Sequence, residues 1–229
     1  MASASSEALL TPASAYDLAA PYYDAWKWQA FWRGAELPTL IRTVDQWAAI
    51  RGKPRLADIG CGTGWYLGEL QARCASVVGL DISPAMLAQA RARLPNVELL
   101  HADIRDLPLR DGSFDIVLST RVLSHLADVA LAVSELARVV SKGGLVVLTN
   151  VDSEHDYEET RLPIGGGHIQ ARTFKHARST IQALLESHGL AHVRSQLVTE
   201  GGAIPLEALA GASALAAIGW ITVWRREDG

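Results

Sequence analysis

The segment LADIGCGTG, residues 56–64, constrains the fold of this chain more than any other feature. An apolar run typical of a strand ends at Asp58, and glycines follow at every second position: Gly60, Gly62 and Gly64. Glycine lets a backbone turn sharply and approach a ligand, because no Cβ stands in the way. Open α/β sheets use a strand, such a turn and a following helix to hold nucleotide-like ligands at the carboxyl ends of their strands. The segment therefore predicts an α/β sheet with a nucleoside site at this turn.

Strand and helix patterns alternate on both sides of this segment. Strands are expected at residues 55–59, 76–80, 97–100, 114–119 and 144–149, and helices at 37–50, 65–72, 84–94 and 127–140. Strands separated by single helices predict parallel βαβ units with right-handed crossovers. A last helix at 178–188 is followed by expected strands at 192–197 and 218–226. Because only a loop or short helix separates those two strands, an antiparallel end to the sheet is expected.

The spacing of the glycines bears on which ligand binds. The dinucleotide fingerprint G-x-G-x-x-G would place its third glycine at position 65, where this chain has Trp65. Asp81 ends the second expected strand, where a carboxylate can accept hydrogen bonds from both hydroxyls of a ribose. Asp81 alone does not separate a nicotinamide cofactor from another nucleoside.

The pattern D-x-G-x-G-x-G resembles motif I of the class I S-adenosylmethionine-dependent methyltransferases, in particular their small-molecule members of the "methyltransferase domain 11/25" type. HADIRDLP resembles the adenine motif of that family, and ELARVVSKGGLVVLTN resembles the run before its fifth strand. The resemblance covers about residues 16–197, and its most specific motifs lie within 56–149. It implies a Rossmann-like fold with a seven-stranded, mostly parallel sheet, an antiparallel last strand and helices on both faces.

The resemblance also implies the cofactor, S-adenosyl-L-methionine, and the residues that bind it. These are Tyr16, Tyr22, Asp58, Gly60, Cys61, Gly62, Gly64, Asp81, Ile82, Met86, Asp103, Ile104 and Ser119. Within this set Asp103-Ile104 corresponds to the adenine contact, and Ser119 lies near the methionine part.

His125, in RVLSHLAD, is the candidate catalytic residue. It follows the fourth expected strand, six residues beyond Ser119, and histidine accepts a proton near neutral pH. A hydroxyl acceptor benefits from a general base, so O-methylation is favoured over N- or C-methylation. The alternative is structural, because histidine at this position could instead cap the loop or pack on the cofactor.

Two segments are candidates for binding the methyl acceptor. The opening YDLAAPYYDAW resembles a leading helix that folds over the site in small-molecule methyltransferases, and Tyr23, Trp26 and Trp32 would wall an apolar or aromatic acceptor. Between residues 150 and 177, His155, His168 and Arg172 could reach it. The aromatic rings could instead only fasten the helix, and the polar residues could be solvated. The spacing of Asp152, His155 and Asp156 is not diagnostic of a metal site, and no metal is expected.

The 229 residues are expected to form one methyltransferase domain. Its parts are a flexible tail (1–15), an N-terminal helical lid (16–52), a cofactor-binding core (53–150), a substrate loop (151–177) and the C-terminal part of the sheet (178–229). Residues 205–217 are either a further wall of the pocket or a contact with a second subunit, so the chain is expected to be a monomer or a homodimer.

Composition restricts the partners. A net charge of −4 gives no electrostatic reason to expect nucleic acid, and no run of 18 apolar residues suggests a membrane span. Two cysteines cannot form a disulfide framework, so a cytoplasmic protein acting on a small molecule is expected. Two other functions stay open: a nicotinamide-dependent oxidoreductase on the same kind of sheet, and a catalytically inactive S-adenosylmethionine-binding regulatory protein.

Overall fold

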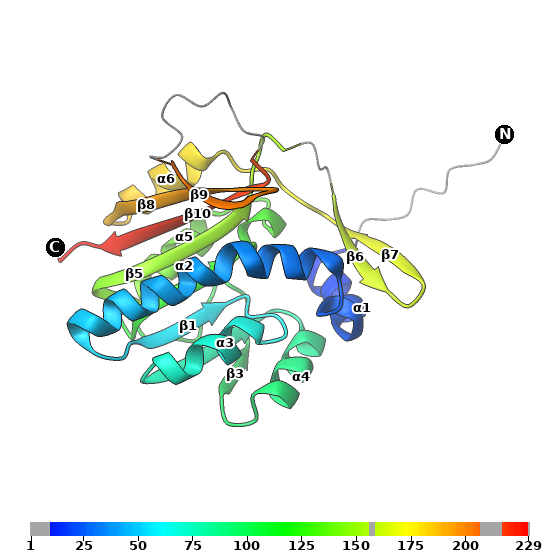
Figure 1. Ribbon diagram of the computed structural model, residues 1–229, viewed down its shortest axis with the longest axis horizontal. Helices are drawn as coiled ribbons and strands as arrows, with labels where there is room; N and C mark the ends of the chain where they lie inside the picture. The colour runs from blue at the N-terminus through cyan, green and yellow to red at the C-terminus, as the bar shows by residue number, and fades with distance from the viewer. Residues whose placement is uncertain (1–9, 156–158, 207–216, 229) are drawn as a thin grey trace.

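A twisted sheet forms the centre of the computed structural model, which describes residues 10–155, 159–206 and 217–228 (Figure 1). Its strands are β1 (Arg55–Ile59), β2 (Ser76–Asp81), β3 (Glu98–His101), β4 (Phe114–Thr120), β5 (Val140–Val151), β8 (Leu190–Thr199), β9 (Gly202–Pro205) and β10 (Gly219–Arg226). They lie in the order β3-β2-β1-β4-β5-β10-β8-β9.

The strand directions confirm the expected fold class. β3, β2, β1, β4 and β5 are parallel, and β10 is antiparallel to both of its neighbours, β5 and β8. These are the seven expected strands. The short strand β9 pairs antiparallel with β8 and adds an eighth strand at the edge. The parallel order brings the carboxyl ends of β1, β2, β3 and β4 together at one end of the sheet, where the candidate site lies.

Helices cover both faces of the sheet. α2 (Lys27–Arg51), α3 (Trp65–Leu70) and α4 (Pro84–Arg93) pack on one face, and α5 (Ala130–Val139) and α6 (Arg178–Ser187) pack on the other. Short 3₁₀ helices η1 (Gln71–Arg73) and η2 (Leu123–His125) complete the loops. Alternate residues of a strand point into the apolar cores on the two faces of the sheet. In β1, Leu56 faces α2 and α3, and Ala57 faces α5. Strands buried on both faces read as nearly continuous apolar runs, which is why the sequence predicts them well.

Helix α2 is longer than expected. It begins at Lys27 rather than near residue 37 and continues through Pro38. Proline inside a helix removes one backbone hydrogen bond, so sequence reasoning places a helix start there. In this helix the buried Trp32 and Leu40, on either side of Pro38, hold both halves against the sheet. No helix in the described part of the chain is both long and apolar enough to cross a membrane.

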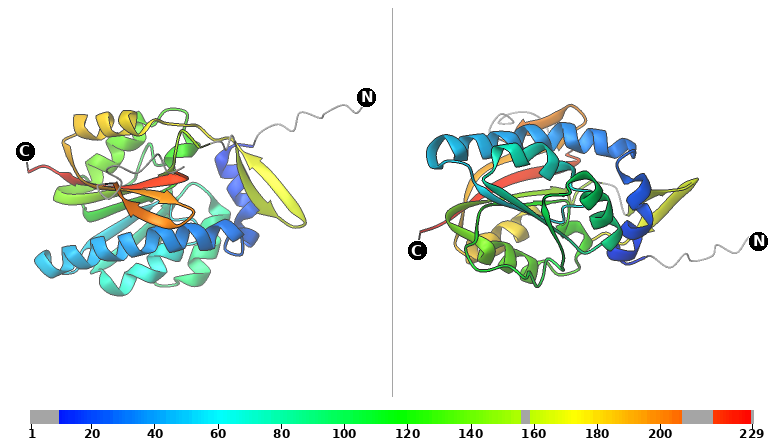
Figure 2. Two further views of the ribbon diagram at one scale, coloured as in Figure 1. Left: turned by 45° about the horizontal axis from the view of Figure 1, so that its top comes forward. Right: turned by 90° about the horizontal axis from the view of Figure 1, so that it is seen from below.

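A separate cap stands at the carboxyl end of the strands. It consists of α1 (Pro12–Tyr23) and the hairpin of β6 (Thr160–Ile164) and β7 (Gly167–Ala171), which project together beyond the sheet in Figure 2. Ala15, Ala19, Leu162 and Ala171 form an apolar cluster of their own between them. Two expectations change here. α1 starts at Pro12, inside the expected tail, and residues 1–9 lie outside the described part. The expected substrate loop 151–177 contains a hairpin.

Candidate functional site

The LADIGCGTG turn connects β1 to α3 and is held against β2. The backbone N–H groups of Gly60 and Cys61 both donate to the carbonyl of Leu80, at 2.7 and 2.9 Å. Gly60 has φ +83°, and a Cβ there would lie 2.2 Å from Cγ2 of Val122. Only glycine therefore fits this position, where the turn packs against the loop that follows β4.

Asp81, at the tip of β2, is bound into the same turn. Its carboxylate accepts hydrogen bonds from the backbone N–H of Gly62 and of Ser83, each at 2.8 Å. Burial raises the pKa of Asp81, although these hydrogen bonds and that from Ile82 oppose the shift. A carboxylate offers about four lone-pair positions, so at least one remains for a hydroxyl in the cavity that Asp81 lines.

Asp58, at the end of β1, is fully buried. Neither carboxyl oxygen has a hydrogen-bond partner among the described residues. Burial, with the nearby carboxylates of Asp81 and Glu36 in addition, raises the pKa of Asp58 to about 7. A buried acceptor without a donor has a free-energy cost, and a positively charged ligand group beside it would offset that cost.

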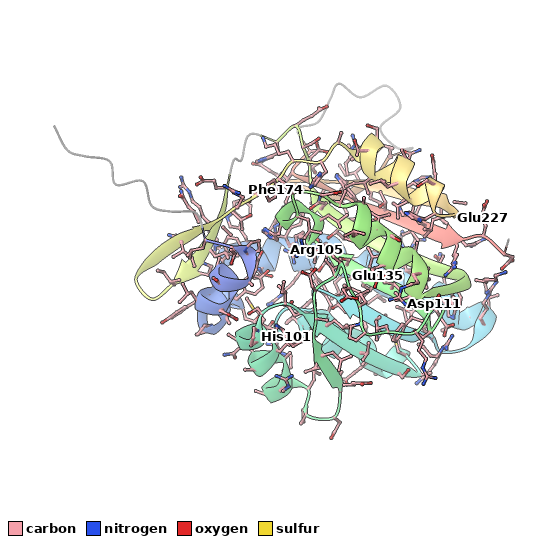
Figure 3. All side chains as sticks on the ribbon, turned by 180° about the vertical axis from the view of Figure 1, so that it is seen from behind. His101, Arg105, Asp111, Glu135, Phe174 and Glu227 are labelled. Carbon is pink, nitrogen blue, oxygen red and sulfur yellow. The ribbon has the colours of Figure 1, made fainter. Side chains whose placement is uncertain are left out.

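A cavity of about 360 Å³, here called the strand-end cavity, opens at the carboxyl ends of β1, β2, β3 and β4. Its walls include Gly60, Gly62, Asp81, Ile82, Asp103, Ile104, Thr120 and Val122. Asp103 is paired with Arg105, whose Nη2 lies 2.5 Å from Oδ2 of Asp103, and this hydrogen bonding lowers the pKa of Asp103. Figure 3 shows Arg105 near the middle of the back face.

A second cavity of about 500 Å³, here called the aromatic cavity, lies beside the first. Its walls are mostly aromatic rings and a few charged groups: Tyr16, Tyr23, Trp26, Trp28, Trp32, Arg121, Ser124, His125, Val151, His155, Glu159, Thr160, Arg161 and Ile218. Four residues line both cavities, namely Tyr16, Tyr23, Arg121 and His125. A group bound in one cavity would therefore meet a group bound in the other at these four side chains.

His125 is held from two directions. The hydroxyl of Tyr16 lies 2.8 Å from Nε2, and the carbonyl of Arg172 lies 3.4 Å from Nδ1. A proton on Nδ1 satisfies the carbonyl and leaves Nε2 to accept from Tyr16, so the contacts favour this neutral tautomer. Burial, with the charge of Arg121 in addition, lowers the pKa of His125 to about 4. At neutral pH the imidazole is therefore uncharged.

Arg121 follows β4 and has φ +59°, a left-handed conformation that residues other than glycine seldom adopt. Its Nε lies 3.5 Å from Oε1 of Glu36, which is completely buried and also accepts from the hydroxyls of Tyr66 and Thr149. The guanidinium stacks on Trp32, 5.2 Å from the ring centre. Burial disfavours its charge, but Glu36 and nearby tyrosines outweigh burial and raise the pKa of Arg121. A permanent positive charge thus stands at the junction of the cavities.

Two aspartates attach α1 to the rest of the site. Asp17 accepts from the Ser83 hydroxyl at 2.6 Å and from the Ala85 N–H at 3.0 Å, at the N-terminus of α4. Asp24 accepts from Arg33, Arg93 and Thr63, at 2.5, 2.6 and 2.8 Å. Thr63 belongs to the glycine-rich turn. The two carboxylates therefore fix the cap over the strand-end cavity.

The structure brings together many of the residues expected at the site, but not all. Tyr16, Gly60, Gly62, Asp81, Ile82, Asp103 and Ile104 line the strand-end cavity; Tyr23, Trp26, Trp32, His125 and His155 line the aromatic cavity. Cys61, Met86 and Ser119 are buried outside both walls, and Gly64 caps α3. Tyr22 and His168 are exposed away from both cavities, and Arg172 approaches His125 only through its carbonyl. Asp156 and most of 205–217 lie outside the described residues.

Two residues of the site, Arg121 and Glu36, are not anticipated from the sequence. Tyr22, expected at the cofactor, is exposed, whereas Tyr23, expected at the acceptor, lines both cavities together with Tyr16, since residues seven apart lie on one face of a helix. That spacing is visible in the sequence. Arg121 and Glu36 carry no comparable signal, because they are 85 positions apart and meet only through the packing of α2 on the sheet.

Comparison with known proteins agrees with this geometry. A family model described as a methyltransferase domain matches residues 57–148. A probable S-adenosylmethionine-dependent methyltransferase of Mycolicibacterium smegmatis is 38% identical over 92 residues, which are 40% of this chain and 36% of that protein. Malonyl-(acyl-carrier protein) O-methyltransferase of Erwinia billingiae is 35% identical over 123 residues, which are 53% of this chain and 49% of that protein. The chain thus spans less than half the length of either relative.

A solved structure shows the same fold over most of the chain. An S-adenosylmethionine-dependent methyltransferase from Mesorhizobium loti superposes with a TM-score of 0.58 and 23% identity, over 79% of this chain and 97% of that one. The family match covers the glycine-rich turn and the ends of the first four strands of the sheet, where the strand-end cavity lies. Residues 57–148 therefore match a methyltransferase domain, and the fold around them is that of S-adenosylmethionine-dependent methyltransferases.

Proposed function

We propose that this protein transfers the methyl group of S-adenosylmethionine to a small organic acceptor, most readily to oxygen. The observation that supports this most strongly is the pair of adjoining cavities, which share Tyr16, Tyr23, Arg121 and His125. In this proposal the strand-end cavity takes the cofactor and the aromatic cavity takes an apolar or aromatic acceptor. The similarity to a malonyl-(acyl-carrier protein) O-methyltransferase supports oxygen as the receiving atom.

The residues present fit the cofactor. Asp81 would hold the ribose hydroxyls, and Asp103 and Ile104 the adenine; all three line the strand-end cavity. Asp58 is buried outside both cavity walls, and its carboxyl, which has no hydrogen-bond partner among the described residues, would attract the positively charged amino-acid end. The cofactor supplies an electrophilic methyl group on a sulfonium, and the electron pair of the broken carbon–sulfur bond stays on sulfur. The protein contributes position, orientation and exclusion of water.

Tyr16 and His125 form the proton-accepting pair of this proposal. A protonated acceptor donates to the oxygen of Tyr16, whose own proton passes to Nε2 of His125 across the 2.8 Å contact. The resulting imidazolium keeps its Nδ1 proton toward the carbonyl of Arg172. Tyr16, and not His125 alone, is then the group that meets the acceptor.

The proposal is tested by calorimetry and by labelled methyl transfer. S-adenosylhomocysteine should bind to the wild-type protein, and Asp81→Ala should weaken that binding by at least about tenfold, since a charged hydrogen-bond partner is lost. Tight binding of NAD⁺ without a response to S-adenosylhomocysteine would overturn the proposal. Transfer of labelled methyl to members of a phenol, enol and carboxylate library tests the catalytic step and rules out a purely regulatory protein.

The cellular location and the oligomeric state are also proposals. A cytoplasmic location is supported by the two cysteines, Cys61 and Cys74, which are buried and not joined in a disulfide. A monomer or homodimer is proposed, and sedimentation in the presence of S-adenosylhomocysteine distinguishes the two.

A further inference from the structure

Arg121 is a buried cation with an unusually incomplete set of partners. Its side chain is only 14% exposed, yet no carbonyl or side chain among the described residues accepts a hydrogen bond from its guanidinium. Its ion-pair partner among the described residues is Glu36, whose Oε1 lies 3.5 Å from Nε without good hydrogen-bond geometry. A guanidinium has five N–H donors, and buried donors normally find acceptors.

The position of Arg121 indicates where the missing acceptor would be. The residue lines both cavities, and its guanidinium stacks on Trp32, which lines the aromatic cavity alone. The left-handed backbone at φ +59° has a free-energy cost that a functional placement explains. Trp32 and Glu36 leave the guanidinium few ways to move, since both belong to the rigid helix α2.

We propose that Arg121 binds an anionic oxygen of the methyl acceptor, so that the acceptor class is a carboxylate, phenolate or enolate carried on an apolar or aromatic body. This inference rests on the proposed function and names the substrate class of the same site. The aromatic walls would receive the body, and Arg121 would receive the charge at the junction with the strand-end cavity. An ionised acceptor needs no strong base before transfer.

The proton-accepting pair supports the same class. His125 is a weak base here, because its pKa is lowered to about 4 and Nε2 already accepts from Tyr16. A weak base removes a proton effectively only from an acidic hydroxyl or acid, and a neighbouring cation makes such a group more acidic. An aliphatic alcohol would gain little from this arrangement.

The anionic oxygen bound by Arg121 could instead belong to the carboxylate at the amino-acid end of the cofactor. The stacking of Arg121 on Trp32 favours the acceptor side, and the experiment separates the two sources. Benzoate and benzamide serve as matched probes of nearly equal shape, titrated at one pH into protein saturated with S-adenosylhomocysteine and followed by calorimetry or ligand-observed NMR. A fixed pH is used because Asp58, close to Arg121, has a pKa of about 7.

The wild type should bind benzoate at least about tenfold more tightly than benzamide, as expected for a charge-assisted hydrogen bond. Arg121→Gln should abolish the preference, whereas Arg121→Lys should retain part of it. Arg110→Gln is the matched control, because Arg110 is an exposed arginine that lines neither cavity, and the preference should persist. Since Arg121→Gln leaves Glu36 buried without a cation, Glu36→Gln/Arg121→Gln provides a second variant without that charge.

Three results would overturn the inference: no preference for benzoate in the wild type, binding of neither probe, or a preference that survives Arg121→Gln. A fourth would reassign Arg121 to the cofactor: loss of affinity for S-adenosylhomocysteine in Arg121→Gln with unchanged affinity for methylthioadenosine, which lacks the amino-acid end. Failure of the wild type to bind S-adenosylhomocysteine at all would instead contradict the proposed function, so the two failures are distinguishable.

Discussion

At the scale of single residues, the ionised form of Asp58 is unfavourable in the folded protein. The ordinary pKa of 3.8 is raised to about 7 by burial and by neighbouring carboxylates. Between about pH 4 and pH 7 the folded state therefore binds more protons at this residue than the unfolded state does, so the free energy of unfolding falls as pH rises through this window.

Asp58→Asn should remove this dependence, because an amide does not ionise. At pH 8 the variant should be more stable than the wild type by on the order of 1 to 4 kcal/mol, and the advantage should disappear near pH 4. Urea unfolding of both proteins at the two pH values measures the difference. The same substitution should weaken S-adenosylhomocysteine binding, whose affinity in the wild type should increase as pH rises through 7. Equal pH profiles for the two proteins would contradict this role of Asp58.

For His125, the predicted dependence of the free energy of unfolding on pH has the opposite sign. Its pKa is lowered from 6.5 to about 4, so the unfolded state binds the proton first and the stabilising contribution is lost as pH falls from 6.5 to 4. NMR titration should show a neutral His125 imidazole at pH 5, and Tyr16→Phe should change the pKa of that imidazole.

His125 is also tested by methyl transfer. His125→Gln should lower turnover by about 10²-fold or more with little change in cofactor affinity. Turnover like that of the wild type would leave His125 a structural role only.

At the scale of elements, α1 is expected to control entry to the strand-end cavity through Asp24. This carboxylate joins the end of α1 to Arg33 in α2, Arg93 in α4 and Thr63 in the glycine-rich turn. Burial opposes its ionisation, but the hydrogen bonds from Arg93, Thr63 and Arg33 outweigh burial and lower the pKa of Asp24. The carboxylate is therefore charged throughout the neutral range and holds three elements together.

Asp24→Asn should loosen this attachment without unfolding the sheet. We expect faster hydrogen exchange in α1 and faster dissociation of S-adenosylhomocysteine, by about tenfold for the loss of charge-assisted hydrogen bonds. Asp115→Asn is the matched control, because Asp115 pairs with Arg55 at the opposite end of the sheet. Dissociation that changes equally in both variants would show that Asp24 does not act on the cavity.

The elements also show how far sequence reasoning reaches. The five parallel strands and the helices between them are predicted because each is a local pattern: an apolar run, a cap or a glycine stop. The strand-end cavity follows from those patterns, since strand ends place Asp81 and Asp103 at one edge of the sheet. The hairpin β6–β7 is missed, although Gly165–Gly167 mark its turn, because its partner α1 is about 150 positions away. Contacts such as Arg121 with Glu36 depend on packing between distant segments, which no local pattern encodes.

At the scale of the whole molecule, the structure divides into a large core on the two faces of the sheet and a small cap beyond its edge. The cap has its own apolar cluster, in which Leu162 is fully buried against Ala15, Ala19 and Ala171. Leu148, equally buried, lies instead in the core that packs against α5. Regions with few buried apolar contacts open locally at lower free energy than the core, and the cap is such a region.

Truncation of these two leucines should therefore have different consequences. Leu148→Ala should lower the global free energy of unfolding by about 2 to 5 kcal/mol, as for other large-to-small core substitutions. Leu162→Ala should change global stability much less, because the cap can open while the sheet stays folded. It should instead accelerate hydrogen exchange in α1 and β6–β7 together, and bound S-adenosylhomocysteine should slow that exchange in both segments. If Leu162→Ala lowered global stability as much as Leu148→Ala, the cap and the sheet would be one cooperative unit, and access to both cavities would require unfolding of the sheet rather than movement of the cap.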